Sequence, residues 1–363
     1  MREALRKFLR FSAIYGPRRA LFKAAGRLRL GRARLLGIPR QNQARDIGLI
    51  GCGQFAFATI GYVIATRFGN RLAACYDIDR KAAATLAHFY DAADCKSAHA
   101  VISNPDVKTV YIASSHSTHA DYAIEALQAG KTVYVEKPIA VSRDQLQRLL
   151  AARDASTGRL FAGYNRPFSP AIRELRALYQ KPAGPFTLTC TIVGHVIPAD
   201  HWYRDPAEGT RVCGNLGHWL DLAMHLVSWR QLPKDWKISC RWSNAAERDD
   251  NLAITLTSSA GDLVNIVMTS RSEPFEGVQE AIFLQWGDVI AAIDDFRSMS
   301  VRIGSRLVRK SYRPKDVGHI AAILQPFEGD GRDFSEVEHS TELMLRIAEM
   351  VRDGVEDAQI TFS

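Results

Sequence analysis

The sequence predicts an α/β chain with two different halves: a parallel sheet with crossover helices up to about residue 165, followed by an α+β domain with antiparallel strands. Apolar strand-like runs alternate with helical patterns between residues 46 and 165, as in parallel sheets with crossover helices. From residue 166 to about 335, strand-like runs follow one another through short links, which favours antiparallel pairing. The length of 363 residues also exceeds what one core usually serves.

The first predicted strand and its helix meet at a glycine-rich turn, GCGQFA at residues 51–56. This is the G-x-G-x-x-A form of the dinucleotide fingerprint, and it follows a strand and precedes a helix as the motif requires. Gly51 permits the tight turn, Gly53 lets the backbone approach a pyrophosphate, and Ala56 lets the helix pack on the strand. Gln54 and Phe55 begin the helix, whose free N–H groups suit phosphates. We therefore predict that these five residues bind a dinucleotide.

An acidic residue ends the second predicted strand, in RLAACYDIDR at residues 71–80. Asp77 stands where a carboxylate would accept hydrogen bonds from the adenosine ribose and repel a 2′-phosphate. The predicted cofactor is therefore NAD, with NADP less favoured. Arg80 and Lys81 could still shield a phosphate. Asp79 is expected to cap the helix that begins at Arg80.

Lys137 follows a strand-like run and precedes a proline, in GKTVYVEKPIAVS at residues 130–142. A lysine mounted at a buried strand end is confined, and a catalytic lysine depends on such confinement for its pKa and its reach. Other polar residues also stand at predicted strand ends, where the ligands of parallel sheets bind. These are Ser114, Ser115, His116, Glu136 and Asn165. Each could be a plain turn residue, but their common placement predicts one cofactor-binding rim.

The chain resembles the Gfo/Idh/MocA family of glucose-fructose oxidoreductases and inositol dehydrogenases in five motifs: IGLIGCGQFA, YDID, SSHSTHA, VYVEKPIAVS and GYNRPFSP. The resemblance covers about residues 46 to 350. It implies a Rossmann domain and a second domain with an open, largely antiparallel sheet whose face carries the substrate. It also implies NAD(P)-dependent oxidation or reduction of a sugar, cyclitol or nucleotide-sugar hydroxyl. The implied cofactor site contains Gly51, Gly53, Asp77, Ser114, His119, Glu136 and Lys137, and Lys137 would also touch the reacting hydroxyl.

The second half contains strand-like runs at residues 186–194, 251–259, 262–270 and 280–288. Helices are predicted from about Asn215 to Trp229 and from about Ser335 to Arg352. The first of these presents His218, Asp221 and His225 on one face. A metal site there is geometrically feasible. We predict none, because the helix must also bury an apolar stripe and Asp221 is as readily used in a salt bridge.

A polar loop places Asp200, His201 and Trp202 after a proline. A loop tryptophan beside His and Asp suits a sugar, whose ring faces stack on the indole while its hydroxyls bind the polar groups. The alternative is that Trp202 anchors the loop on its own domain. Arg166 and Asn215 complete the predicted substrate set. The loop and the helix after it also resemble the oxidoreductase half of bi-domain family members.

Family members commonly have an aspartate four residues before a helical histidine that serves as general acid/base. The histidine matches His218, but position 214 is glycine and the adjacent polar residue is Asn215. An amide cannot accept a proton as a carboxylate does, so His218 would act alone, with an unperturbed pKa of about 6.5. The expected mechanism has the substrate hydroxyl hydrogen-bonded to Lys137 and His218 while its carbon faces C4 of the nicotinamide.

The net charge of +8 conceals a basic arm. Residues 1–45 hold thirteen lysines and arginines against Glu3, a net charge of +12, so the remaining residues carry −4. Apolar residues recur along the arm at roughly helical spacing, with a break at Gly16-Pro17. The arm could pack on the catalytic domains or a second subunit, which we favour, or lie on an anionic membrane surface. A transit peptide and a nucleic-acid contact are less favoured, and we predict no nucleic-acid partner.

The predicted domains are therefore residues 1–45, 46–165 and 166–363. Composition is ordinary globular usage, with 47% hydrophobic and 24% charged residues and no apolar run long enough for a membrane span. Six cysteines without C-x-x-C spacing indicate reduced thiols. We expect a cytoplasmic homo-oligomer, with peripheral contact at the inner membrane surface as an open alternative.

Three functions stay open. The leading one is an NAD(P)-dependent dehydrogenase or reductase of a sugar or nucleotide sugar, with cell-surface polysaccharide synthesis as one setting. The second is a glycoside hydrolase or lyase that oxidises and then re-reduces its sugar. The third is a non-catalytic, cofactor-bound protein, because the family aspartate is missing.

Overall fold

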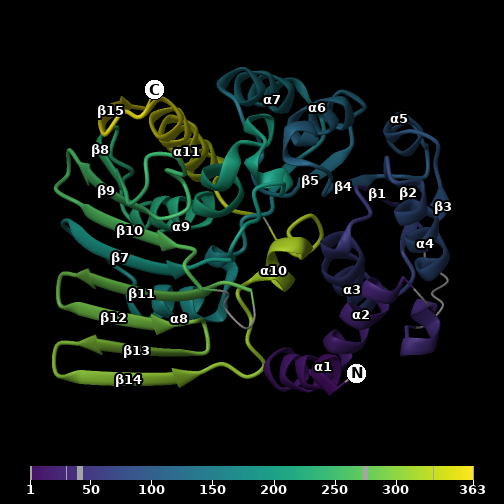
Figure 1. The fold of residues 1–363 in the computed structure, drawn as a ribbon, viewed down its shortest axis with the longest axis horizontal. Helices are drawn as coiled ribbons and strands as arrows, with labels where there is room; N and C mark the ends of the chain where they lie inside the picture. Colours follow the sequence, from purple (N-terminus) through teal and green to yellow (C-terminus); the bar gives the residue numbers. More distant parts are fainter. Residues whose placement is uncertain (1, 30, 39–43, 273–276, 330, 363) are drawn as a thin grey trace. The chain divides into compact units, whose positions relative to one another are not determined.

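In a computed structural model, which describes residues 2–29, 31–38, 44–272, 277–329 and 331–362, six parallel strands form the first sheet (Figure 1). Their order is β3-β2-β1-β4-β5-β6, the order of a doubly wound dinucleotide-binding sheet. The strands are β1 (Ile47–Ile50), β2 (Leu72–Tyr76), β3 (Ala93–Asp94), β4 (Thr109–Ile112), β5 (Thr132–Val135) and β6 (Leu160–Ala162). Every residue of β1 and β4 is buried, as in parallel sheets covered on both faces. The predicted parallel sheet is confirmed, and the short β3 is an addition.

Helices connect these strands as the sequence predicts. They are α3 (Gly61–Phe68), α4 (Arg80–Tyr90), α5 (Ala98–Ile102), α6 (His119–Gln128) and α7 (Arg143–Ala155). A π-helical turn, Ala56–Ile60, precedes α3. The side chain of Asp79 accepts hydrogen bonds from the N–H groups of Lys81 and Ala82, so its predicted capping role is confirmed.

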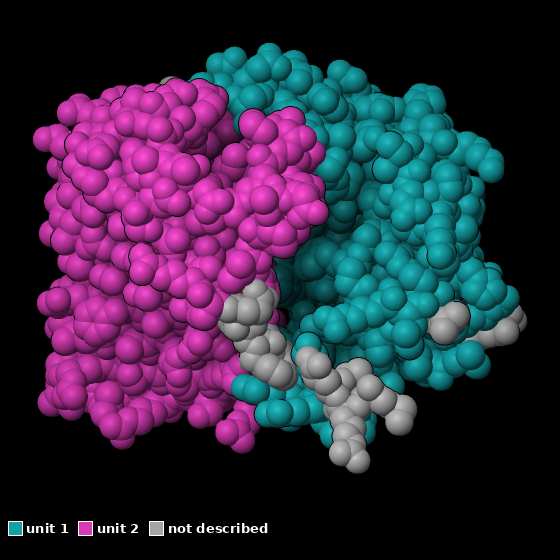
Figure 2. Space-filling model, in the orientation of Figure 1, with its two compact units in different colours: residues 1–163, 319–331 teal, residues 164–318, 332–363 magenta. Residues whose placement is uncertain are grey.

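The chain divides into two compact units, shown in different colours in Figure 2. The first unit comprises residues 1–163 and 319–331, and the second comprises residues 164–318 and 332–363. The predicted boundary at residue 165 falls two residues late, and residues 319–331 return to the first unit. Helix α10 (His319–Leu324) explains the return, because the buried hydroxyl of Tyr111 donates to the carbonyl oxygen of Ile323 at 2.6 Å. Local patterning could not reveal this long-range contact.

The basic arm belongs to the first unit and is not a separate domain. It forms α1 (Arg2–Tyr15), α2 (Pro17–Leu28) and a 3₁₀ turn (Ala33–Leu36). The break between the helices lies at Gly16, as predicted. Phe22 of α2 is fully buried and packs edge-on against Tyr62 and Phe89. The packing interpretation of the arm is therefore confirmed for α2. Arg40, one of the arm's thirteen basic residues, lies outside the described residues.

Nine strands of the described second unit form an open sheet in the order β14-β13-β12-β11-β7-β10-β9-β8-β15. They are β7 (Phe186–Val193), β8 (Asp235–Trp242), β9 (Leu252–Ser258), β10 (Leu263–Thr269), β11 (Gln279–Trp286), β12 (Val289–Asp294), β13 (Ser298–Ile303), β14 (Arg306–Ser311) and β15 (Asp357–Thr361). The largely antiparallel sheet is confirmed. One pair differs, because β7 and β10 are parallel. Their pairing spans β8 and β9, so the rule for consecutive strands does not apply to it.

Helices α8 (Pro170–Leu178), α9 (Gly217–Val227) and α11 (Phe334–Asp353) pack against this sheet. The opposite face is open, because alternate residues of β11 are exposed. A π-helical turn, Val212–Leu216, precedes α9, so the predicted start at Asn215 falls inside that turn. None of the helices in the described ranges is long and apolar enough to cross a membrane.

A buried polar network joins α9 to α11. Arg332 contacts both carboxylate oxygens of Asp221, at 2.8 and 2.7 Å, and also pairs with Glu336 at 2.6 Å. Nδ1 of His225 lies 2.9 Å from Glu336. Burial opposes ionisation of Glu336, but hydrogen bonds from His225 and the Arg332 charge lower its pKa to about 2. Asp221 and His225 therefore hold two helices together, and no metal-binding group of three His, Cys, Asp or Glu occurs within the described residues.

Candidate cofactor and active site

The carboxyl ends of the parallel strands meet at one edge of the first sheet. The N–H of Gly51 bonds to the carbonyl oxygen of Tyr76 at 2.9 Å, and the N–H of Ala113 bonds to Ile50 at 2.7 Å. The N–H of Glu136 bonds to Ile112 at 2.9 Å. The glycine turn, the end of β2, the end of β4 and the Glu136-Lys137 turn are thus neighbours, as the sequence predicts for a cofactor rim.

The glycine turn has the geometry that a dinucleotide pyrophosphate requires. Gly51 has a φ of 92°, and a Cβ there would lie 2.3 Å from the carbonyl oxygen of Ala113, so only glycine fits. The position of a Cβ on Gly53 has no heavy atom within 4 Å, which leaves open space over the backbone. Ala56 is buried under the helix. These residues fit NAD, whose phosphates would lie against the exposed N–H groups.

Asp77 is half-buried and lies directly beside this turn. Its carboxylate accepts hydrogen bonds from the N–H of Cys52 at 2.5 Å and of Asp79 at 2.8 Å. A carboxylate offers about four acceptor positions, so acceptor capacity remains for ribose hydroxyls. The guanidinium of Arg80 is already engaged, since it pairs with Asp94 and bonds to the carbonyl oxygens of Cys95 at 2.8 Å and of Asp77 at 3.3 Å.

Ile78 was not predicted as a site residue, yet it follows Asp77 and is 88% exposed. An apolar side chain this exposed, at the end of β2, would be covered by a flat apolar group such as adenine. The sequence signal for Ile78 is its position directly after Asp77, the acid predicted to bind the ribose.

Two predicted cofactor residues direct their side chains into the protein. Nε2 of Gln54 donates to the carbonyl oxygen of Lys23 in α2 at 3.1 Å. Phe55 packs edge-on against His319, with ring centroids 5.6 Å apart. Their side chains therefore position the helix start, and only their backbone remains for the cofactor.

The side chain of His119 connects two segments of the first unit. Its side chain is buried, with Nδ1 2.8 Å from the carbonyl oxygen of Pro138 and Nε2 3.1 Å from that of Ser114. We therefore assign it the role of tying the β4 end to the lysine turn, in place of the cofactor contact that the resemblance implies. His116 is buried as well. Ser114 is half-buried with its Oγ 2.7 Å from Oγ1 of Thr118, and Ser115 is exposed.

Lys137 is half-buried at the end of β5, and its peptide bond to Pro138 is cis. The preceding Glu136 is buried and accepts hydrogen bonds from the hydroxyl of Tyr134 at 2.8 Å and from the N–H of Lys137 at 3.3 Å. Burial raises the pKa of Glu136 to about 7, against the opposing effects of the Lys137 charge and the Tyr134 hydrogen bond. Gly163 makes room for this carboxyl, because a Cβ there would lie 2.9 Å from it.

We expect Glu136→Gln to stabilise the protein as pH rises. The folded pKa of about 7 exceeds the ordinary value of 4.5, so ionisation opposes folding, and stability is lost as pH rises through 7. Between pH 5 and pH 8 the parent should lose on the order of 3 kcal/mol of unfolding free energy through this group. Glu136→Gln lacks the titrating group and should not show this loss. Urea unfolding at both pH values measures this. The exposed Glu247→Gln is the control, and an equal pH dependence in parent and Glu136→Gln would contradict the assignment.

Asn165 and Arg166 lie in the second unit, just past the end of the first. Nδ2 of the buried Asn165 donates to the carbonyl oxygen of Val317 at 2.6 Å. Arg166 is buried in a two-pronged pair with Glu280, with distances of 2.7 and 3.1 Å, and its guanidinium lies 4.3 Å over the ring of Trp219. The predicted substrate role of Arg166 gives way to a structural one, because its charge is already neutralised inside the protein.

The remaining predicted substrate residues also belong to the second unit. His218 is half-buried in the first turn of α9, with its ring edge-on to Tyr164 at 6.0 Å. Asn215 is half-buried in the preceding π-helical turn, and its Oδ1 accepts no hydrogen bond within the described structure. Gly214, where the family has an aspartate, is buried. Lys137 and His218 lie in different units, so their joint action stays a proposal.

The predicted sugar-binding loop is anchored by a residue other than Trp202. Arg204 pairs with Asp250 at 2.9 Å through both prongs and bonds to the carbonyl oxygen of Ile197 at 2.8 Å. Trp202 is 46% exposed and stacks on His201, with ring centroids 5.8 Å apart. Asp200 is exposed. Anchorage by Arg204 weakens the alternative in which Trp202 holds the loop.

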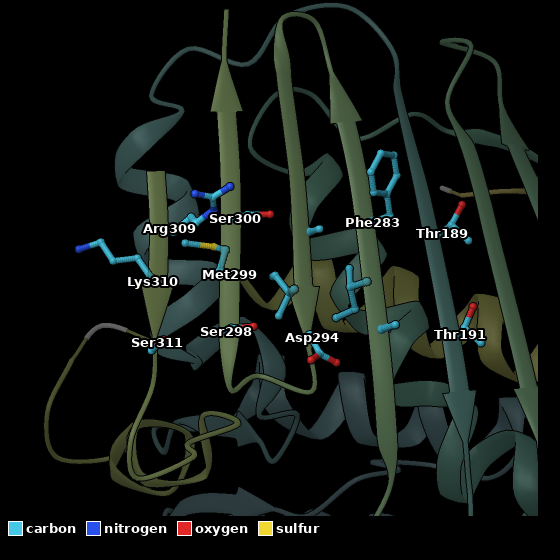
Figure 3. Close-up of a pocket in the computed structure, with 14 residues that line it drawn as sticks. Thr189, Thr191, Phe283, Asp294, Ser298, Met299, Ser300, Arg309, Lys310 and Ser311 are labelled. Carbon is cyan, nitrogen blue, oxygen red and sulfur yellow. The ribbon is translucent and has the colours of Figure 1, made fainter. Parts of the chain in front are cut away.

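A pocket of about 560 Å³ lies on the open face of the second sheet (Figure 3). Residues of β7, β11, β12, β13 and β14 line it, including Thr189, Phe283, Asp294, Ser300 and Arg309. None of the predicted substrate residues is among those that line it. The expectation that a sheet face carries the substrate therefore finds no support in this pocket.

The sheet order and the glycine turn are those of a dinucleotide-binding domain. Residues 45–164 match the Gfo/Idh/MocA family model, described as an oxidoreductase family with an NAD-binding Rossmann fold. Residues 45–164 thus match the NAD-binding Rossmann domain of that family, as the resemblance predicts.

Inositol 2-dehydrogenases are among its relatives. The one from Ralstonia nicotianae is 32% identical over 46% of this chain and 48% of its own length. The one from Gluconacetobacter diazotrophicus is 26% identical over 72% of this chain and 78% of its own length. The matched region thus spans about half the length of the first relative.

Solved structures share the fold of both units. The UDP-N-acetylglucosamine 3-dehydrogenase from Acidithiobacillus ferrooxidans is 18% identical, with a TM-score of 0.71 over 86% of this chain and all of its own. The WlbA dehydrogenase from Bordetella pertussis, solved with NADH and UDP-GlcNAcA, is 20% identical, with a TM-score of 0.67 over 88% of this chain and 99% of its own. At this identity the likeness shows the fold alone.

Proposed function

We propose that the protein is an NAD-dependent oxidoreductase that moves a hydride between nicotinamide and a hydroxyl or keto carbon of a sugar or nucleotide sugar. The observation that carries the proposal is the placement of Lys137. It is confined at the end of β5, on the same strand edge as the glycine turn and Asp77. The relatives named as inositol 2-dehydrogenases support a polyhydroxylated substrate.

The side chains divide the work as follows. Lys137 donates a hydrogen bond that orients the reacting hydroxyl, and His218 takes or returns the proton of that hydroxyl. Position 214, where the family has an aspartate, is glycine. Trp202 offers an exposed ring face to the sugar, beside His201 and Asp200. NAD, when bound, supplies the hydride acceptor. Synthesis of cell-surface polysaccharide is a fitting setting, because nucleotide sugars are its precursors.

Incubation of the full chain with NAD and a panel of inositols, sugars and nucleotide sugars tests this function. We expect net NADH formation, followed by its fluorescence, with at least one member of the panel. Glycoside cleavage without net NADH would instead indicate transient oxidation. NAD binding without turnover on any member would indicate a non-catalytic protein, consistent with Gly214 in place of the family aspartate. Either outcome would overturn the leading proposal.

We infer that a second copy of the chain covers the open sheet face. Exposed apolar side chains of Val267, Phe283 and Ile290 alternate with buried residues along their strands. Asp294 and Arg309 line the pocket on this face, so in a two-fold dimer the acid of one copy could pair with the arginine of the other. Light scattering should give an oligomer for the parent and a smaller species for Phe283→Arg. A monomeric parent, or an unchanged Phe283→Arg oligomer, would contradict this interface.

We also infer that α1 contacts anionic lipid. Leu5 and Leu9 are each 58% exposed and lie one turn apart, beside the exposed Arg6 and Arg10. Deleting the arm would strip Phe22 from the core, so point variants are the better test. Leu5→Glu/Leu9→Glu should abolish flotation with anionic vesicles, whereas Leu307→Glu, on β14, should not. Absence of flotation by the parent would refute the contact.

A further inference from the structure

The basic arm lies directly on the dinucleotide turn of the first unit. Helix α2 packs so closely there that a Cβ on Gly26 would lie 2.9 Å from the ring of Phe57 and 3.0 Å from Nε2 of Gln54. Gln54 in turn bonds to the carbonyl oxygen of Lys23 at 3.1 Å. The arm is therefore built into the wall of the turn that holds the cofactor.

Arg29, at the end of α2, contacts the glycine turn directly. Its backbone is left-handed, with φ 53° and ψ 39°, and its N–H bonds to the carbonyl oxygen of Ala25. A non-glycine residue adopts this conformation only where its surroundings fix it. The guanidinium lies 5.2 Å from the centre of the Phe57 ring, and its Nη1 donates to the carbonyl oxygen of Cys52 at 2.8 Å.

Cys52 thus stands between two opposite charges. Its N–H donates to the carboxylate of Asp77 at 2.5 Å, and its carbonyl oxygen accepts from Arg29 at 2.8 Å. Arg29 therefore lies at the ribose-binding end of the cofactor site. Within the described residues Arg29 pairs with no carboxylate. Its guanidinium has five N–H donors, and the bond to Cys52 uses one of them. Arg80, the cation that the sequence suggests for a phosphate, is already paired with Asp94.

We propose that Arg29 is a cofactor-specificity residue that binds the 2′-phosphate of NADP, so that the site accepts NADP as well as NAD. The positive charge offsets the repulsion that Asp77 alone would exert on a 2′-phosphate. Its unused N–H donors suit a phosphate, which arginine binds through two prongs. The arm then also contributes to cofactor binding, because its Arg29 supplies a positive charge for the 2′-phosphate.

Titration of the full chain with NADH and with NADPH, each followed by fluorescence, tests this. Arg29→Gln should weaken NADPH binding by about tenfold or more, the effect of losing a charge-assisted hydrogen bond, and change NADH binding by less than about threefold. Arg27→Gln is the matched control, because Arg27 is an exposed arginine of the same helix. It should alter neither affinity. Equal weakening of both cofactors would overturn the proposal, since Arg29 would then only hold the turn.

If Arg29→Gln folds poorly, Arg29→Lys can be used in its place. A double-mutant cycle of either Arg29 variant with Asp77→Asn then tests the proposal. Asp77→Asn should raise NADPH affinity strongly in the parent and less in either Arg29 variant, since both residues face the same phosphate. Additive effects of the two changes would overturn the proposal. Both readouts are binding constants, so they do not depend on whether a substrate has been found.

Discussion

Lys137→Ala should abolish turnover while leaving NADH binding nearly intact. In the proposed function the ammonium orients the reacting hydroxyl, and the loss of such positioning and proton transfer lowers rates by about 10²- to 10⁴-fold or more. NADH affinity should change little, because the glycine turn and Asp77 are the proposed contacts of the other end of the cofactor. Steady-state kinetics and an NADH fluorescence titration on one preparation separate the two effects.

Lys96→Ala is the matched control for this change, since Lys96 is an exposed lysine of the same unit. It should leave both quantities unchanged. Turnover in Lys137→Ala at the level of the parent would show that the confined lysine does not serve the reaction. A large loss of NADH binding would show that it mainly serves the cofactor.

Arg166→Met should destabilise the second unit by about 3–5 kcal/mol, the usual penalty for breaking one side of a buried ion pair. Glu280 is 2% exposed, and within the described residues its charge would keep the indole N–H of Trp219, at 2.8 Å, as its side-chain donor. Urea unfolding followed by tryptophan fluorescence measures the loss, because Trp219 lies against the guanidinium.

Arg173→Met, at an exposed position of α8, is the control and should change stability by less than about 0.5 kcal/mol. If Arg166→Met instead folds with parental stability but raises the KM for substrate, the substrate role predicted from the sequence would be restored.

The sequence predicts the first unit well because its signals are local. The strand ending at Gly51, the acid at Asp77, the cap at Asp79 and the lysine after β5 each depend on a few neighbouring residues. Parallel strands buried on both faces are also continuous apolar runs, which are easy to find.

The contacts that were missed join residues far apart in the chain. The ion pair of Arg166 with Glu280 spans 114 positions, and the bond from Arg29 to Cys52 spans 23. Strand β13 carries several polar residues and β14 has no buried residue, which weakens the alternating apolar pattern of both strands. The cofactor role of His119 rests on the resemblance alone, and only the fold shows that both of its ring nitrogens face carbonyl oxygens.

A crystal structure of the protein soaked with NAD and the nucleotide sugar that forms most NADH tests the central claim most directly. We expect a substrate hydroxyl within about 3 Å of Nζ of Lys137, with its carbon facing C4 of the nicotinamide. A substrate bound with Lys137 out of hydrogen-bonding reach of every hydroxyl would contradict the assignment of Lys137 as the residue that carries the reaction.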